Sequence, residues 1–259
     1  MMKVEFDKGP SVAMAKLLLQ YPDYSPVKEY FWFNWGPIFY RGRLDKSAKI
    51  LCVASDPGPT ERIAGRALIG NAGQRVQGFL SKLGITKSYV CLNGFVYSLH
   101  PSHLSDGIKL LSDPAHILWR NKVFDAATGA QLQAIIAFGD VAKKAVDLWT
   151  GKGSVPVFKT YHPSYRGDES VLTADWNRVV NEVRAIVTKD SDGNNTLPLY
   201  DNSITESDYS PIPSRDLPFG AADFLGDEHW LRLKGSKKMN SVTRPSGNDF
   251  TLTWEAPQP

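Results

Sequence analysis

Three polar side chains with complementary chemistry, Asp56, Asn93 and His162, follow or end short apolar runs of this sequence. A carboxylate can stabilise an oxocarbenium-like sugar and orient water, and an imidazole N–H can stabilise a departing anion. An amide carries both a donor and an acceptor, so it can read a base edge that presents a carbonyl beside an N–H. An exocyclic amine in place of that carbonyl would set donor against donor, which distinguishes uracil from cytosine. The three groups therefore suit hydrolysis of an N-glycosidic bond whose pyrimidine leaves as an anion.

The runs before these side chains predict buried strands. The run at 49–54 breaks into Ser55-Asp56-Pro57-Gly58-Pro59, which can neither continue a strand nor start a helix at once. Further strands are expected at 89–93, 134–138 and 155–161, and helices at 74–83, 113–128, 140–149 and 173–187. Strands that alternate with helices predict a parallel sheet with helices on both faces. Ligands of such sheets bind at the carboxyl ends of the strands, so the three polar side chains should face one crevice.

The absence of common catalytic and phosphate-binding motifs argues against several other functions, a nucleotide triphosphatase among them. The sequence has no G-x-x-x-x-G-K-[ST], no G-x-G-x-x-G after a strand, no G-x-S-x-G and no H-E-x-x-H. Its two cysteines, Cys52 and Cys91, exclude a disulfide framework, a four-thiolate zinc site and a four-cysteine iron–sulfur cluster. Both cysteines lie inside apolar runs and are interpreted as core thiols.

Three segments together resemble the uracil-DNA glycosylase superfamily. Ala54–Gly58, continuing through residues 65–74 (Gly-Arg-Ala-Leu-Ile-Gly-Asn-Ala-Gly-Gln), looks like its first motif. Tyr89–Asn93 resembles its second, uracil-reading strand, and His162-Pro163-Ser164 its last motif. Each motif alone is weak, but the three occur in order at predicted strand ends, and the resemblance covers about residues 35–187.

The resemblance implies a three-layer α/β/α sandwich around a four-stranded parallel sheet, and excision of uracil from DNA without a metal or cofactor. By position, Asp56 matches the aspartate that activates water, Asn93 the asparagine that binds uracil, and His162 the histidine that stabilises the uracil anion. The base pocket is expected to include Ser55, Gly58, Leu68 and Phe95. DNA contacts are expected from Arg66, Arg75, Ser164, Tyr165 and Arg166, with Tyr165 or Arg166 filling the gap left by the flipped base.

The sequence also departs from the superfamily pattern. Gly58 stands where the ordinary enzymes have a tyrosine that blocks the thymine methyl group, and Leu68 stands where the thermostable iron–sulfur group has an aromatic residue that stacks on the base. Another ring must then stack, with Phe95 or Tyr97 as candidates. The cluster cysteines of that group are missing, and residues 59–66 contain no histidine for covalent capture of DNA. The resemblance is thus to a cluster-free, bacterial-type member that keeps an aspartate in the first motif.

Simpler interpretations stand beside these roles. Asp56 before a proline and Asn93 before a glycine are common turn residues. His162 has a rival in His100, which begins a second His-Pro-Ser tripeptide, but that copy follows the second strand and is expected to have no helix within ten residues. The aromatic stretch 30–40 is interpreted as a lid over the core, with a binding platform as the alternative.

The charge distribution divides the chain. The whole carries 30 basic and 27 acidic residues, a net charge of +3. Residues 1–187 hold 23 basic and 16 acidic residues, or +7, and residues 188–259 hold the other 7 and 11, or −4. A basic unit suits DNA, whose phosphates supply most sequence-independent affinity, and Arg62 also lies beside the crevice loops. Residues 188–259 are expected to form an irregular acidic extension docked on the domain, with a last strand at 249–255.

No window is long and apolar enough for a membrane span, and residues 1–10 lack the apolar core of a signal peptide, so a cytoplasmic protein is expected. The protein is also expected to be a monomer. The favoured function is a monofunctional uracil-DNA glycosylase of base excision repair that leaves an abasic site. Two alternatives stay open. One is a glycosylase of the same fold acting mainly on hypoxanthine or mismatched thymine, and the other is a protein that binds damaged or abasic DNA without turnover.

Overall fold

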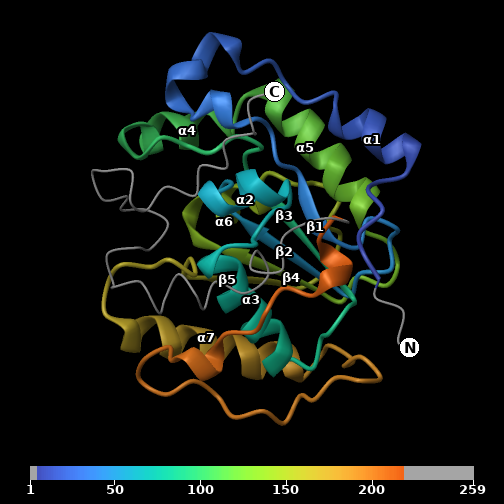
Figure 1. Cartoon of the computed structure of the whole chain (residues 1–259), viewed down its shortest axis with the longest axis vertical. Helices are drawn as coiled ribbons and strands as arrows, with labels where there is room; N and C mark the ends of the chain where they lie inside the picture. The colour runs from blue at the N-terminus through green and yellow to red at the C-terminus, as the bar shows by residue number, and fades with distance from the viewer. Residues whose placement is uncertain (1–4, 219–259) are drawn as a thin grey trace, which may run out of the picture.

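Among residues 5–218, which the computed structural model describes, one mixed sheet of five strands lies between two layers of helices (Figure 1). The strands are β1 (Tyr40–Gly42), β2 (Ile50–Ala54), β3 (Tyr89–Asn93), β4 (Ala134–Phe138) and β5 (Val157–Thr160), in the order β1-β3-β2-β4-β5. β2 to β5 pair in parallel, and β1 pairs antiparallel with β3. The predicted α/β sandwich is confirmed, with a fifth strand beyond the predicted parallel four.

The central strands form where short apolar runs meet chain breakers. Every residue of β2, β3 and β4 is buried, as expected of parallel strands covered on both faces. Alternation along each strand divides the core in two: Leu51 and Val53 of β2 point to one cluster, and Ile50 and Cys52 point to the other. The sheet is therefore a rigid frame whose carboxyl edge can hold side chains in fixed places.

The extra strand β1 was not predicted, because the charged residue Arg41 interrupts its apolar pattern. Arg41 is fully buried and donates through Nη1 to Gln77 Oε1 at 2.8 Å and to Asp216 Oδ2 at 3.2 Å. A buried guanidinium is tolerated only when paired and hydrogen-bonded in this way. Since its carboxylate partner comes 175 residues later in the chain, no local pattern predicts the strand.

Seven α-helices of residues 5–218 complete the layers. They are α1 (Val12–Leu18), α2 (Pro59–Ala64), α3 (Asn71–Lys82), α4 (Leu104–Leu110), α5 (Pro114–Ala127), α6 (Gly139–Asp147) and α7 (Glu169–Arg184). Short 3-10 helices lie at Ser25–Tyr30, Phe33–Trp35, Pro101–His103, Glu206–Asp208 and Ser214–Asp216. The core cluster on one face draws on α1, α5 and α6, and the cluster on the other draws on α3 and α7. α7 begins at Glu169, earlier than the expected residue 173, because the Asp168 side chain caps its first turn.

Residues 188–218, here called the C-terminal strap, run over α3 and α7 (Figure 1). Tyr200 packs into the core beside Trp176 and exchanges two hydrogen bonds of 2.8 Å with the Asn177 side chain. Lys82 pairs with Asp208 at 2.9 Å. These contacts hold residues that follow the last helix against the domain.

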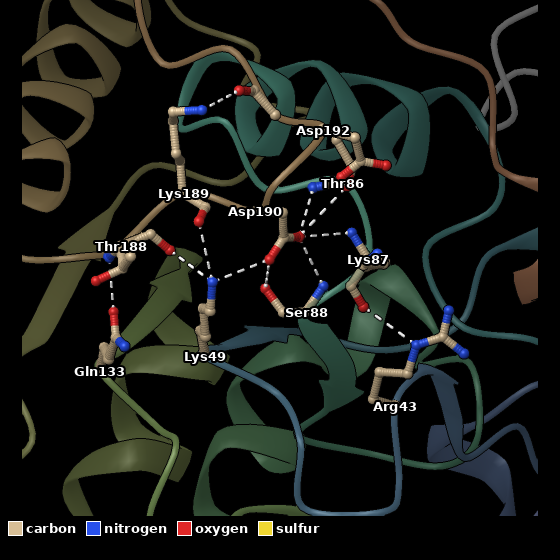
Figure 2. Close-up of polar contacts among 11 residues, drawn as sticks. Arg43, Lys49, Thr86, Lys87, Ser88, Gln133, Thr188, Lys189, Asp190 and Asp192 are labelled. Atoms are coloured by element: carbon tan, nitrogen blue, oxygen red, sulfur yellow. Dashed lines mark hydrogen bonds and ion pairs between the residues drawn. The ribbon is translucent and has the colours of Figure 1, made fainter.

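The strap is also tied to the amino ends of β2 and β3 through Asp190 (Figure 2). Its carboxylate accepts the backbone N–H groups of Thr86, Lys87 and Ser88 at 2.9–3.1 Å, and Lys49 Nζ lies 3.1 Å away. Burial alone would raise the pKa of Asp190, but hydrogen bonds from the Ser88 hydroxyl, from the N–H groups of Lys87 and Ser88 and from Lys49 outweigh it and hold the pKa below its usual range.

Residues 219–259, which include the strand expected at 249–255, lie outside the described residues. Within residues 5–218, no helix combines the length and apolarity that a membrane crossing requires.

Candidate active site at the carboxyl edge of the sheet

The carboxyl ends of β2, β3 and β5 bring the three predicted side chains to one edge. Ala54 at the end of β2 pairs with Asn93 at the end of β3, and Asp56 follows two residues after Ala54. His162 follows β5 by two residues, and its Cβ lies 3.0 Å from where a Cβ on Gly139, the residue directly after β4, would be. Gly139 has a φ of +83°, so a residue with a side chain would be strained there as well as crowded against His162. The three side chains therefore share one edge of the sheet, which is built from four adjacent strand ends.

The Asp56 carboxylate is held in a fixed orientation while part of its surface stays open. Its Oδ2 accepts the backbone N–H of Leu99 at 2.8 Å, and the side chain is partly exposed. Burial raises the pKa of Asp56 to about 6; hydrogen bonds from Ser55 and Leu99 limit the rise, and the charge of Glu61 adds to it. A carboxylate with that pKa is ionised at neutral pH and can serve as a base toward water.

His162 is arranged as a neutral hydrogen-bond donor. The backbone N–H of Ser164 donates to His162 Nδ1 at 3.1 Å, so the proton of the neutral ring is on Nε2. Burial lowers the pKa of His162 to about 4, which keeps the ring neutral at pH 7. The free Nε2–H can donate to an oxygen on which negative charge develops.

Asn93 has a buried side-chain amide that no group among residues 5–218 satisfies. The residue is 7% exposed, and neither its Nδ2 nor its Oδ1 has a hydrogen-bond partner. An unpaired buried polar group costs about 1–3 kcal/mol, so native proteins keep few of them without a reason. A ligand that offers one acceptor and one donor would satisfy both atoms.

The first-motif loop depends on Glu61, a residue that the sequence interpretation missed. Glu61 is 6% exposed, and its Oε2 accepts the N–H of Gly58 at 2.9 Å. Its Oε1 accepts the N–H groups of Ile69 and Gly70 at 2.7 and 2.8 Å. The available signal was the helix start itself, with a proline in the first turn and a glutamate three residues after Gly58.

Two glycines fit this loop for steric reasons. A Cβ on Gly58 would lie 2.7 Å from Glu61 Oε2, so a larger residue at 58 would displace the carboxylate that holds the loop. A Cβ on Gly73 would collide with the backbone carbonyl of Leu68, and Leu68 itself has a left-handed φ of +51°. The loop thus keeps a strained shape that its neighbours impose.

The candidates for stacking on a base are placed less favourably. Phe95 is 0% exposed and packs edge-to-face on Phe31 at 5.4 Å, so neither ring face is open. Leu68 and Tyr97 are also buried, and Tyr97 stacks on Phe33 at 4.7 Å. Ser55 is partly exposed beside Asp56. In this structure, Phe95 and Tyr97 serve the core, and a stacking role would require them to move.

The basic residues near this edge of the sheet fall into two groups, those that bind other residues of the protein and those that are exposed. Arg66 pairs with Asp7 at 2.6 Å and lies over the Tyr40 ring. Arg75 donates to Pro163 O at 2.9 Å and to the Tyr209 hydroxyl of the strap at 2.7 Å, so it links the last motif to the strap. Contacts of Arg66 and Arg75 with DNA remain predictions.

The exposed group surrounds the last motif and the start of α2. Arg62 and Arg166 are exposed, as is Ser164, and Tyr165 is partly exposed against Tyr161 at 4.6 Å. These residues are accessible to solvent, and their contacts with DNA likewise remain predictions.

The rival His100 lies closer to the edge than its place in the chain suggests. It comes one residue after Leu99, whose N–H binds Asp56. The expectation that no helix follows it is wrong: a 3-10 helix starts at Pro101 and α4 at Leu104, because the His100 side chain accepts the N–H of Ser102 and caps this start. Its ring packs at 4.9 Å on Trp32.

Within residues 5–218, no group of three or more His, Cys, Asp or Glu side chains is placed to hold a metal ion. Cys52 and Cys91 are free and buried.

Comparison with known proteins gives one finding. The family model of the uracil DNA glycosylase superfamily matches residues 41–179, more than half of the 259-residue chain and including all three motif segments. No curated protein matches the chain. The match agrees with the resemblance in motifs and with the α/β architecture, and the chain belongs to the uracil DNA glycosylase superfamily.

Proposed function

We propose that this protein excises uracil from DNA by hydrolysing its N-glycosidic bond and leaves an abasic site. Superfamily membership makes it a DNA glycosylase, a hydrolase of DNA repair, and the choice of uracil is the proposed step beyond that. The observation that carries it is the buried, unpaired amide of Asn93 at the end of β3, beside the end of β2 that Asp56 follows and on the same edge of the sheet as His162. This amide matches a pyrimidine edge that offers a carbonyl beside an N–H.

In the proposed reaction the glycosidic bond breaks before the new bond between water and the sugar forms, or as it forms. The glycosidic bond breaks with its electron pair going to N1 of uracil, and His162 Nε2–H donates to the carbonyl oxygen on which the charge gathers. Asp56 stabilises the cationic sugar and orients a water whose oxygen bonds to C1′. The proton of that water passes to Asp56 and then to solvent, and the uracil anion takes a proton from solvent. Water is the only co-substrate.

The base must leave the helix before these groups can reach it. Tyr165 and Arg166 lie in the loop after His162 and are exposed enough to fill the gap.

We also propose that the protein works as a monomer in the cytoplasm.

A second substrate class is favoured by one observation at Gly58. The tyrosine that excludes thymine in ordinary enzymes has no room there while Glu61 holds the loop. Mismatched thymine or hypoxanthine is therefore the alternative substrate. A protein that binds damaged or abasic DNA without turnover is the other alternative, and the intact set of Asp56, Asn93 and His162 argues against it.

One assay separates these functions. Single- and double-stranded oligonucleotides carrying uracil, hypoxanthine or thymine opposite guanine are incubated with the protein and then treated with alkali to cut abasic sites. We expect cleavage at uracil that is lost in Asp56→Ala and strongly reduced in His162→Ala. Asn93→Asp should shift the preference toward cytosine, and unchanged selectivity would reject its role in reading the base. Binding without cleavage of any substrate would refute both enzyme functions.

A further inference from the structure

Five aromatic rings form a continuous row on the surface beside the active-site edge. Tyr30 stacks on His103 at 4.9 Å, and His103 contacts His100 at 6.0 Å. His100 lies 4.9 Å from Trp32, which stacks nearly parallel on Trp35 at 5.3 Å and 13°. We call these five residues the aromatic row.

The row differs from the other aromatic residues of its segment in its exposure. Trp32 is 43% exposed, although tryptophan is a residue that proteins usually bury, and the other four rings are partly exposed. Phe31 and Tyr40 of the same stretch are in the core. A lid over the core explains the buried rings of this stretch but leaves Trp32 without an explanation.

A cation completes one end of the row. The exposed guanidinium of Arg62 lies 5.8 Å from the centroid of the Trp35 ring. At the other end, Asp106 lies 3.5 Å from His103, and its charge is balanced by Lys109 at 3.2 Å, so Arg62 supplies the unbalanced charge beside the row. A polyanion is therefore favoured at the Trp32, Trp35 and Arg62 end.

The backbone connects the row directly to the catalytic carboxylate. Trp32 N donates to Ser98 O at 2.8 Å, and His100 N donates to Tyr30 O at 2.7 Å. Between these bonds lies Leu99, whose own N–H donates to Asp56 at 2.8 Å. His100 of the row therefore directly follows Leu99, the residue whose N–H group binds the Asp56 carboxylate.

The same end of the row is close to Asp56 along a second path. Arg62 belongs to α2, which begins three residues after Asp56. A chain whose target base sits at Asp56 would therefore pass close to this end of the row.

Proteins bind unpaired nucleotides with exposed aromatic rings next to cations, since every base has a face that can stack on a ring and every nucleotide has a phosphate that attracts positive charge. We propose that the exposed ring of Trp32, supported by Trp35 stacked on it and by Arg62 beside Trp35, is a stacking platform for an unpaired base that flanks the excised base in a single strand. This inference rests on the proposed function, because it takes the substrate to be DNA. It assigns this protein a grip on single-stranded DNA that a paired duplex, whose bases are already stacked, would not engage.

The test measures binding of a labelled oligonucleotide without uracil by fluorescence anisotropy, in single-stranded and blunt double-stranded form. Stacking on an aromatic side chain contributes enough that Trp32→Ala or Trp35→Ala should weaken single-strand binding by about 5- to 100-fold, with a much smaller effect on the duplex. Trp32→Phe keeps a ring and should retain most of the affinity. Arg62→Gln should weaken binding and lower the slope of log affinity against log salt by about 1.

Ile186→Ala is the matched control, because Ile186 is 47% exposed just after α7, in the opposite layer. It should bind both forms like the parent protein. Single-strand affinity that is unchanged in both tryptophan variants and in Arg62→Gln would overturn the platform, and so would equal losses on both DNA forms in folded variants. A parent protein that releases no uracil but shows the ring-dependent binding would refute the proposed function and leave the platform standing.

Discussion

Replacing Asp56 by asparagine should remove activity and at the same time stabilise the protein. The carboxylate is needed to orient water and stabilise the sugar cation, so excision should fall by orders of magnitude. Yet the folded protein holds this charge at a cost, because burial raises the pKa of Asp56 from 3.8 to about 6. Asparagine can still accept the Leu99 N–H and carries no charge to bury.

The size of the gain follows from that pKa and has a definite pH dependence. Since the folded state binds the proton more tightly, the free energy of unfolding of the parent protein falls as pH rises from about 3.8 to about 6 and then levels off. At about 1.4 kcal/mol per pH unit, the penalty is about 1 kcal/mol at pH 4.5 and about 3 kcal/mol at pH 7.5. Solvent at the partly exposed carboxylate screens part of it, so about 1–3 kcal/mol is expected at pH 7.5.

Urea unfolding of both proteins at pH 4.5 and 7.5 measures this difference. The matched control is Asp201→Asn, because Asp201 is exposed in the strap; it should change stability by less than about 0.5 kcal/mol at either pH. A variant that is less stable than the parent at pH 7.5, or equally shifted at both pH values, would refute the argument that Asp56 is held ionised at the expense of stability. Such an exchange of stability for function is common at active sites.

Three further predictions address the other groups. Single-turnover excision should fall with one protonation below about pH 6, as Asp56 takes up a proton, while His162, with a pKa near 4, stays neutral; a profile that is flat down to pH 5 would contradict the pKa of Asp56. Arg75→Met removes the donor to Pro163 O and should slow single-turnover excision by about tenfold or more; an unchanged rate would show that the last motif needs no brace. Asp190→Asn should lower the free energy of unfolding by about 2 kcal/mol at pH 7, and because the pKa of Asp190 is depressed, this difference should shrink as pH falls below about 4; a constant difference would contradict it.

The central strands were predictable because they are apolar throughout and end at chain breakers. β1 was not, because Arg41 interrupts its apolar pattern and finds its partner Asp216 only in the folded chain. Helix starts were predictable within a few residues where a cap such as Asp113 stands beside a proline. The failure to predict β1 arises from a contact between distant segments, which leaves no local signal.

The site was predictable to the extent that it consists of side chains at strand ends. Residue type and order predicted that Asp56, Asn93 and His162 would lie at strand ends on one edge, and their roles in catalysis and base reading stay predictions. The N–H of Leu99 that orients Asp56 could not, because every residue except proline has one. The aromatic stretch shows the same limit, since sequence does not tell which ring faces inward: Phe31 is buried and its neighbour Trp32 is exposed.

The Asp190 contacts have a consequence for how the protein is made. The ribosome releases the chain from its amino end, so Thr86 to Ser88 are available about a hundred residues before their acceptor. Until Asp190 emerges, these three N–H groups and the Lys49 ammonium lack the carboxylate that they bind in the folded protein. Co-translational folding can therefore assemble the sheet, but its amino edge is completed only after α7 and the first turn of the strap have left the ribosome.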